Sequence, residues 1–240
     1  MRAKREPLPE PAAEVVEPGS ARYFAWLYAD AGRRELLSTL LGIEREIESS
    51  LRPGLEHQVA HMRLAWWQEE CDRFARGTPV HPTTRRLLQL AGSCADAVKL
   101  HGLVDSVAWD LAAAPCETRN ALEQHCERWA DAVIVPFAVC GPNAVRADAA
   151  LAQSARSAGR ALREIELLLR LAPDARRGRL RLPLDELDSL GIEPRALANP
   201  PWPEPLNAWM RQRYEALRGS LRGAFATLDP PARRETSALA

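Results

Sequence analysis

Residues 159–192 read GRALREIELLLRLAPDARRGRLRLPLDELDSLGI, and this stretch decides the fold of the chain. Its first part is apolar at every third or fourth position, at Ala161, Leu162, Ile165, Leu168 and Leu169. That spacing predicts an amphipathic helix with one face in a core. Pro173 has no amide donor and disfavours helical geometry at the residue before it, so we expect the helix to end there.

A cluster of arginines follows in the same stretch, with one acid, Asp174, among them. The cluster comprises Arg170, Arg176, Arg177 and Arg179, and we expect the last three in a loop. Guanidinium groups match phosphate oxygens, so the cluster is a candidate site for an anion or a carboxylate-bearing partner. The alternative is a solvated loop that forms weak surface ion pairs with acids at 185–188. The residues alone leave both interpretations open.

The composition favours one globular domain. The chain has 240 residues, of which 46% are hydrophobic, enough for one sizeable core. Its 32 basic and 32 acidic residues cancel, which argues against a general nucleic-acid binder. The five cysteines include no CxxC pair, so neither a disulfide framework nor a zinc site is predicted.

The two ends of the chain differ in composition from its middle. Residues 1–19 combine prolines with alternating charges and are expected to form a disordered leader, and 229–240 a flexible tail. No stretch approaches the roughly 20 apolar residues of a membrane span. We therefore expect a cytoplasmic protein with at most peripheral contact with the inner membrane.

Hydrophobic periodicity predicts about seven or eight helices packed around one elongated core, and no strands. Ser20 is the expected N-cap of the first helix, and Pro136 is expected to kink or end another. The expected helices lie near 21–30, 32–52, 55–76, 83–93, 94–113, 117–139, 144–171 and 206–228. The predicted fold class is all-α, with a single domain over residues 20–228.

Three segments in this order resemble the squalene/phytoene synthase family. They are RYFAWLYADAGRRELLSTLLGIEREI at 22–47, RLAWWQEECDRFARGTPVHP at 63–82, and DARRGR at 174–179 followed by Leu182-Pro183. The resemblance implies an isoprenoid-synthase-type helical bundle around a central cavity. The segment LLRLAP at 168–173 is most similar to the family's non-catalytic branch, of the complex I assembly factor 6 type.

An active synthase of this family holds Mg²⁺ and the substrate diphosphate between two clusters of acids, because Mg²⁺ prefers oxygen ligands in octahedral geometry. The first cluster aligns with residues 48–52, ESSLR, where only Glu48 is acidic and Arg52 replaces the last acid. The second retains Asp174, while Leu171 and Ala172 replace its leading acids. Both clusters are therefore reduced to single acids.

The resemblance thus implies a catalytically degenerate member with no catalytic residue, metal ligand or cofactor. Its expected partner is an isoprenyl diphosphate or an anionic lipid, or a protein during assembly of a respiratory complex. The candidate binding residues are Arg45, Glu48, Arg170, Asp174, Arg176 and Arg177.

The alternative is an active Mg-dependent prenyl transferase that condenses isoprenyl diphosphates in squalene, hopanoid or carotenoid biosynthesis. Glu44 and Glu48 stand four residues apart on one helical face, and this pair would then bind Mg²⁺. A solvated row of charges explains the same spacing and is the interpretation we prefer.

Overall fold

The computed structural model describes residue 16 and residues 18–140 and 149–226. Within these ranges the chain forms ten α-helices and three short 3₁₀ helices, with no strand, which confirms the all-α prediction. The α-helices are α2 (Ala21–Tyr28), α3 (Ala31–Glu48), α4 (His57–Ala75), α5 (Pro82–Ala91), α6 (His101–Leu111), α7 (Arg119–Val139), α8 (Ala149–Leu169), α9 (Leu171–Arg176), α10 (Leu184–Leu190) and α11 (Glu204–Ala226). The 3₁₀ helices are η1 (Ser49–Leu51), η2 (Gly92–Ala97) and η3 (Pro194–Ala198).

Polar side chains cap several helices at their starts. The Ser20 hydroxyl accepts a hydrogen bond from the Tyr23 amide, as predicted, and Asp30 caps α3 in the same way. His81 and Thr118 cap α5 and α7. Each cap satisfies an amide that has no partner within its helix, so these residues fix where the helices begin.

Helix α7 ends at Val139, as predicted, and Pro136 lies in its last turn, where its carbonyl accepts from the Cys140 amide at 2.8 Å. One predicted helix was wrong. The helix expected at 94–113 is divided into η2 and α6, since Val98 adopts an extended conformation and both Val98 and Leu100 turn into the core. Tertiary burial here outweighs local helical preference.

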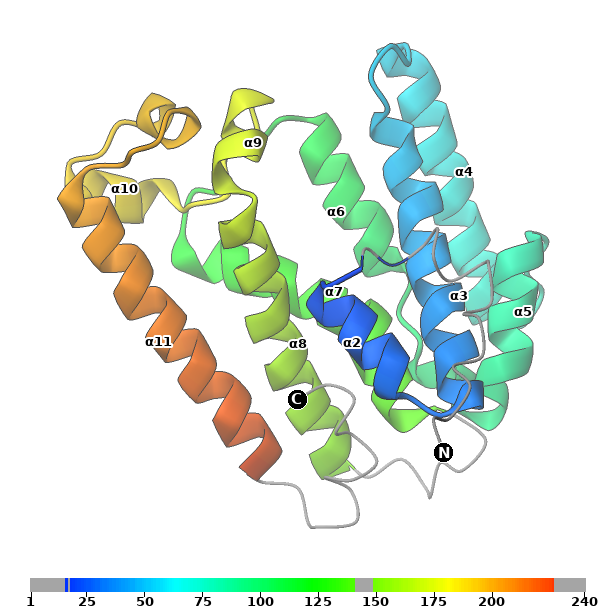
Figure 1. Ribbon diagram of the computed structural model, residues 1–240. Helices are drawn as coiled ribbons and strands as arrows, with labels where there is room; N and C mark the ends of the chain where they lie inside the picture. Colours follow the sequence, from blue (N-terminus) through cyan, green and yellow to red (C-terminus); the bar gives the residue numbers. More distant parts are fainter. Residues whose placement is uncertain (1–15, 17, 141–148, 227–240) are drawn as a thin grey trace, which may run out of the picture.

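Helix α8 lies in the middle of the molecule, with α11 on one side and α2 on the other, while α4 and α5 form the opposite edge (Figure 1). Gly159 allows α8 to approach α7 closely. A Cβ at this position would lie 2.6 Å from the Ala130 Cβ and 3.0 Å from the Ile134 Cβ. A larger residue at 159 would therefore force the two helices apart.

The buried apolar residues form two main clusters rather than the single elongated core that we expected. The first joins α2–α7 with the beginning of α8. The second joins the end of α8 with α9, α10, η3 and α11. Of the predicted leader, only residues 16, 18 and 19 are described, and Val16 is buried in the first cluster. The predicted tail at 229–240 lies outside the described residues.

Candidate functional site

A cluster of paired charges lies where α2, α3 and α8 meet. The Arg22 guanidinium donates from Nη1 to Glu44 Oε2 at 2.5 Å, and from Nε and Nη2 to the two oxygens of Glu166 at 2.6 and 2.7 Å. Burial alone would lower the pKa of Arg22, but Glu44 and Glu166 outweigh it and raise that pKa well above its ordinary value. Arg22 is therefore a permanent cation held between two carboxylates.

Trp129 of α7 and Arg163 of α8 complete this cluster. The Trp129 indole donates to Glu44 Oε1 at 2.7 Å, and the guanidinium groups of Arg22 and Arg163 lie 5.0 and 5.2 Å from the Trp129 ring centroid. Arg163 Nη1 lies 3.2 Å from Glu166 Oε2. Both cations are stabilised by the π electrons of this indole as well as by the acids. We call Arg22, Glu44, Trp129, Arg163 and Glu166 the central cluster.

Glu48 and Arg170 lie beside the central cluster. Glu48 is exposed, yet its pKa is raised, because the surrounding protein removes part of its water and Glu44 repels it. The guanidinium groups of Arg163, Arg22 and Arg170 act in the opposite direction on the same carboxyl. The structure thus brings together two of the predicted residues, Glu48 and Arg170.

The acids of the central cluster do not fit a magnesium ion. Every carboxylate oxygen of Glu44 and Glu166 already accepts an N–H from Arg22 or Trp129. Mg²⁺ needs oxygen ligands at about 2.0–2.1 Å in octahedral geometry, so it would have to displace the guanidinium group. Ser49 and Ser50, next to Glu48, accept hydrogen bonds from Arg63.

Asp174 lies apart from the central cluster. It is buried and accepts from Arg181 Nε at 3.0 Å, while Arg181 Nη1 donates to Asp110 at 2.6 Å. The Asp110 and Asp174 carboxylates outweigh the effect of burial and raise the pKa of Arg181. Arg181 therefore links α9, through Asp174, to α6, through Asp110.

The remaining predicted arginines point in different directions. Arg176 donates from Nε to the Ala198 carbonyl at 2.9 Å, and Arg177 is exposed after α9. Arg45 is exposed on α3, about 100° round the helix from Glu44. The predicted boundary at Pro173 was wrong. Helix α8 ends at Leu169, and Pro173 is the third residue of α9, where its missing amide breaks no helical bond.

Within the described part of the chain, the tryptophans of α2 and α4 lie in different parts of the fold. Trp26 is buried and donates to Ser38, whereas Trp66 and Trp67 pack on His81 at the other edge of the molecule. Beside Arg22 lies a largely apolar cavity of about 40 Å³. Its lining includes Leu37, Leu41, Trp129, Val133 and Leu162.

The residues that dominate the central cluster were missed by our sequence analysis. Arg163 and Glu166 lie within the stretch quoted first, on the helical face opposite the apolar positions, and were assigned no role there. A spacing of three residues between opposite charges was the available signal. Arg22 is 144 residues from Glu166, so no local pattern indicates their pairing.

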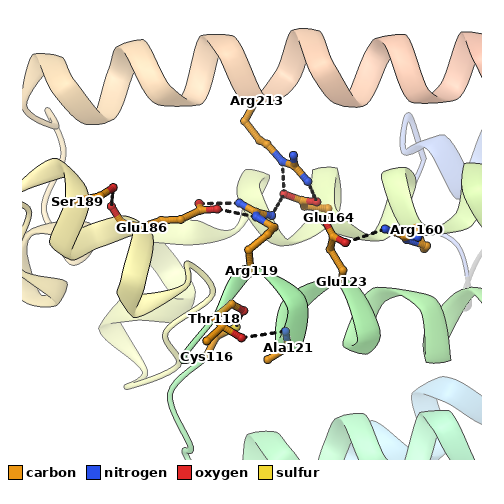
Figure 2. Close-up of polar contacts among 10 residues, drawn as sticks. All are labelled: Cys116, Thr118, Arg119, Ala121, Glu123, Arg160, Glu164, Glu186, Ser189 and Arg213. Atoms are coloured by element: carbon orange, nitrogen blue, oxygen red, sulfur yellow. Dashed lines mark hydrogen bonds and ion pairs between the residues drawn. The ribbon is translucent and has the colours of Figure 1, made fainter.

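A second buried ion network lies on the other side of α8 and ties it to α7, α10 and α11 (Figure 2). Arg119 donates to Glu164 at 2.7 Å and to both oxygens of Glu186 at 2.6 Å. Arg213 of α11 donates to both oxygens of Glu164 at 2.6 Å. Next to this network, a groove of about 460 Å³ separates α8 from α11.

We expect the protein to lose stability in acid because of these pairs. Burial would raise the pKa of Glu164, but hydrogen bonds and charge from Arg213 and Arg119 lower it below the ordinary 4.5, and Glu166 is lowered likewise by Arg22. A lowered folded-state pKa gives stability above the unfolded pKa that is lost as pH falls through the folded value.

Urea unfolding measured from pH 7 to pH 3, about the range that spans these groups, tests this expectation. The urea concentration at the midpoint of unfolding should decrease as the pH is lowered below about 5. In Glu164→Gln this midpoint should depend less on pH. Glu215→Gln, in an exposed pair with Arg218, is the matched control and should follow the wild type. If the midpoint of Glu164→Gln depends on pH as strongly as that of the wild type, Glu164 does not contribute to the loss of stability in acid.

The helical arrangement is an all-α fold of the isoprenoid-synthase type. The sequence pattern of the squalene/phytoene synthase family matches residues 15–240, so the chain belongs to that family. A comparison with curated protein sequences gave no match. Among the described residues, no helix has the length and apolar character needed to cross a membrane.

Two solved structures illustrate the likeness. A dehydrosqualene synthase in complex with ligand superposes with a TM-score of 0.71 at 16% identity, over 96% of this chain and 81% of that one. Squalene synthase HpnC from Alicyclobacillus acidocaldarius gives a TM-score of 0.71 at 14% identity, over 96% of this chain and 88% of that one. These identities are low, so the likeness establishes the fold.

Proposed function

We propose that this protein is a catalytically degenerate squalene/phytoene synthase homologue that binds a lipid with a phosphate or diphosphate head without a metal ion. The observation that carries the proposal is Arg22, whose guanidinium group occupies the carboxylates of Glu44 and Glu166. In a metal-dependent synthase, the acids of the two clusters that align here with residues 48–52 and 171–174 hold Mg²⁺ against the head of the substrate. Here a side chain of the same protein supplies the positive charge.

The head of the lipid binds at Arg170, next to the central cluster, and at Arg177, which follows α9. Both side chains are exposed and, within the described residues, make no hydrogen bond or ion pair. Arg163 Nε is buried and has no partner among the same residues, so it supplies a further donor. Guanidinium groups form strong charge-assisted hydrogen bonds with phosphate oxygens where water is partly excluded.

The tail of the lipid enters from the same side. The cavity of about 40 Å³ beside Arg22 is largely apolar and lies between α2, α3, α7 and α8. Since it holds only a few water-sized volumes, its walls must separate to accept a prenyl or acyl chain.

Titration of farnesyl diphosphate into the protein, with EDTA present throughout, tests this function. We expect binding that is insensitive to EDTA, weakened by salt, and about tenfold or more weaker in Arg170→Ala/Arg177→Ala. Arg218→Ala, an exposed arginine of α11, is the matched control and should bind like the wild type. Equal affinity of all three proteins, or no binding, would contradict the proposal.

A product assay separates this function from its alternative. With Mg²⁺ and farnesyl or geranylgeranyl diphosphate, the wild type should form no squalene, phytoene or presqualene-type diphosphate. Formation of such a product, abolished by Glu48→Ala, would instead establish an active prenyl transferase. Glu48 is chosen because, of the acids near the central cluster, its oxygens accept no hydrogen bond among the described residues.

A further inference from the structure

Two cysteines that are distant in the chain lie against each other. Cys94 is in η2 and Cys140 follows the last residue of α7, 46 residues later. The Cys140 Sγ lies 3.5 Å from the Cys94 carbonyl oxygen, and the Cys94 Sγ lies 3.4 Å from the Val139 carbonyl oxygen. Each thiol thus rests on the backbone that carries the other.

The two thiols differ in exposure. Cys94 is half-buried, whereas the other four cysteines, Cys140 included, are buried. Burial raises the pKa of the Cys140 thiol to about 12, and the adjacent Cys94 thiol adds to this effect. A reagent in solution therefore reaches Cys94 first, and Cys140 is positioned to react with the product.

We propose that Cys94 and Cys140 form a redox-active dithiol site that closes to a disulfide on exposure to a low-molecular-weight disulfide such as oxidised glutathione. The Cys94 thiolate attacks one sulfur of oxidised glutathione, a mixed disulfide forms, and one glutathione thiolate leaves. The Cys140 sulfur then gives up its proton, attacks the Cys94 sulfur and releases the second glutathione. Two protein thiols are oxidised, and one glutathione disulfide is reduced to two thiols.

The disulfide has a defined structural effect. It joins η2 to the end of α7, the helix whose Trp129 packs on the central cluster. Both segments belong to the first apolar cluster, so the bond links parts that are already packed together. Closing a loop of this length reduces the freedom of the unfolded chain, so the oxidised protein should be the more stable form.

The test uses the folded full-length protein incubated with oxidised glutathione, followed by denaturation, alkylation of the free thiols and mass spectrometry. We expect a loss of about 2 Da before alkylation, three of the five cysteines alkylated, and a proteolytic peptide that links residues 94 and 140. The melting temperature should rise by about 5 °C and return after reduction.

Cysteine variants provide the controls for this test. Cys94→Ser and Cys140→Ser should each abolish the loss in mass, while Cys116→Ser, at a buried cysteine elsewhere, should retain it. Five alkylated cysteines in the wild type, glutathione that stays attached to Cys94, or a link through a different cysteine would each overturn the proposal. Because the wild type is measured directly, a variant that fails to fold does not decide the outcome.

Discussion

The Glu164→Gln variant unfolds at a much lower urea concentration than the wild type, with an expected loss of about 3–5 kcal/mol in the free energy of unfolding. The Glu164 side chain is only 4% exposed and lies between Arg119 and Arg213. The glutamine keeps the shape but removes the charge, so Arg213 loses its counter-charge and Arg119 keeps only Glu186. Most of the loss is the cost of this uncompensated positive charge.

Two further variants give this measurement its control. Glu215→Gln removes an acid from a pair on α11 that is exposed on both sides, and should cost less than about 1 kcal/mol. Combining Arg213→Met with Glu164→Gln removes one orphaned cation together with the acid, and should recover part of the loss. Equal effects of Glu164→Gln and Glu215→Gln would contradict the role of the buried network.

Replacing Arg22 by glutamine should lower the free energy of unfolding by about 3 kcal/mol at neutral pH. Glu44 is buried, and it would share the site with Glu166 and Glu48 with only Arg163 and Arg170 to compensate. The variant should also be destabilised least in mild acid, because protonation of one carboxylate relieves the repulsion. Urea unfolding at pH 7 and pH 5, about two units apart, measures both effects.

A compensating variant shows whether charge or packing is responsible. Arg22→Gln/Glu166→Gln removes one charge of each sign and should recover at least half of the loss. The matched control is Arg34→Gln. Arg34 lies near α2, and among the described residues its side chain donates hydrogen bonds only to backbone carbonyls. If the double variant is as unstable as Arg22→Gln, the arginine acts through its packing against Trp129 instead.

Local features of the fold were predictable because they depend on neighbouring residues. Ser20 precedes an amphipathic run, and its N-cap role follows from that position alone. Pro173 shows the limit of such reasoning. A proline disrupts a helix interior but is tolerated in the first turn, so its effect depends on where the new helix starts. That start is fixed by burial of Leu171 in the second apolar cluster.

Only part of the candidate site was predictable from the sequence, because some of its contacts depend on how distant helices pack. Glu48 and Arg170 were identified through family resemblance and do lie close together, although their role awaits the binding experiment. Arg181 was not singled out, yet it is the arginine that pairs with Asp174. Pairings such as Arg22 with Glu166 depend on how whole helices pack, which the local sequence does not encode.

Between Ser154 and Leu168, no residue of α8 is exposed, although this segment includes Arg163, Glu164 and Glu166. Each side of the helix is committed to a different neighbour, namely α7 at Gly159, α2 at Glu166 and α11 at Glu164. A charged residue on such a helix can be exchanged safely only when its partner on another helix changes too. Tolerated substitutions in this segment are therefore expected in pairs, one on α8 and one on the helix that it contacts.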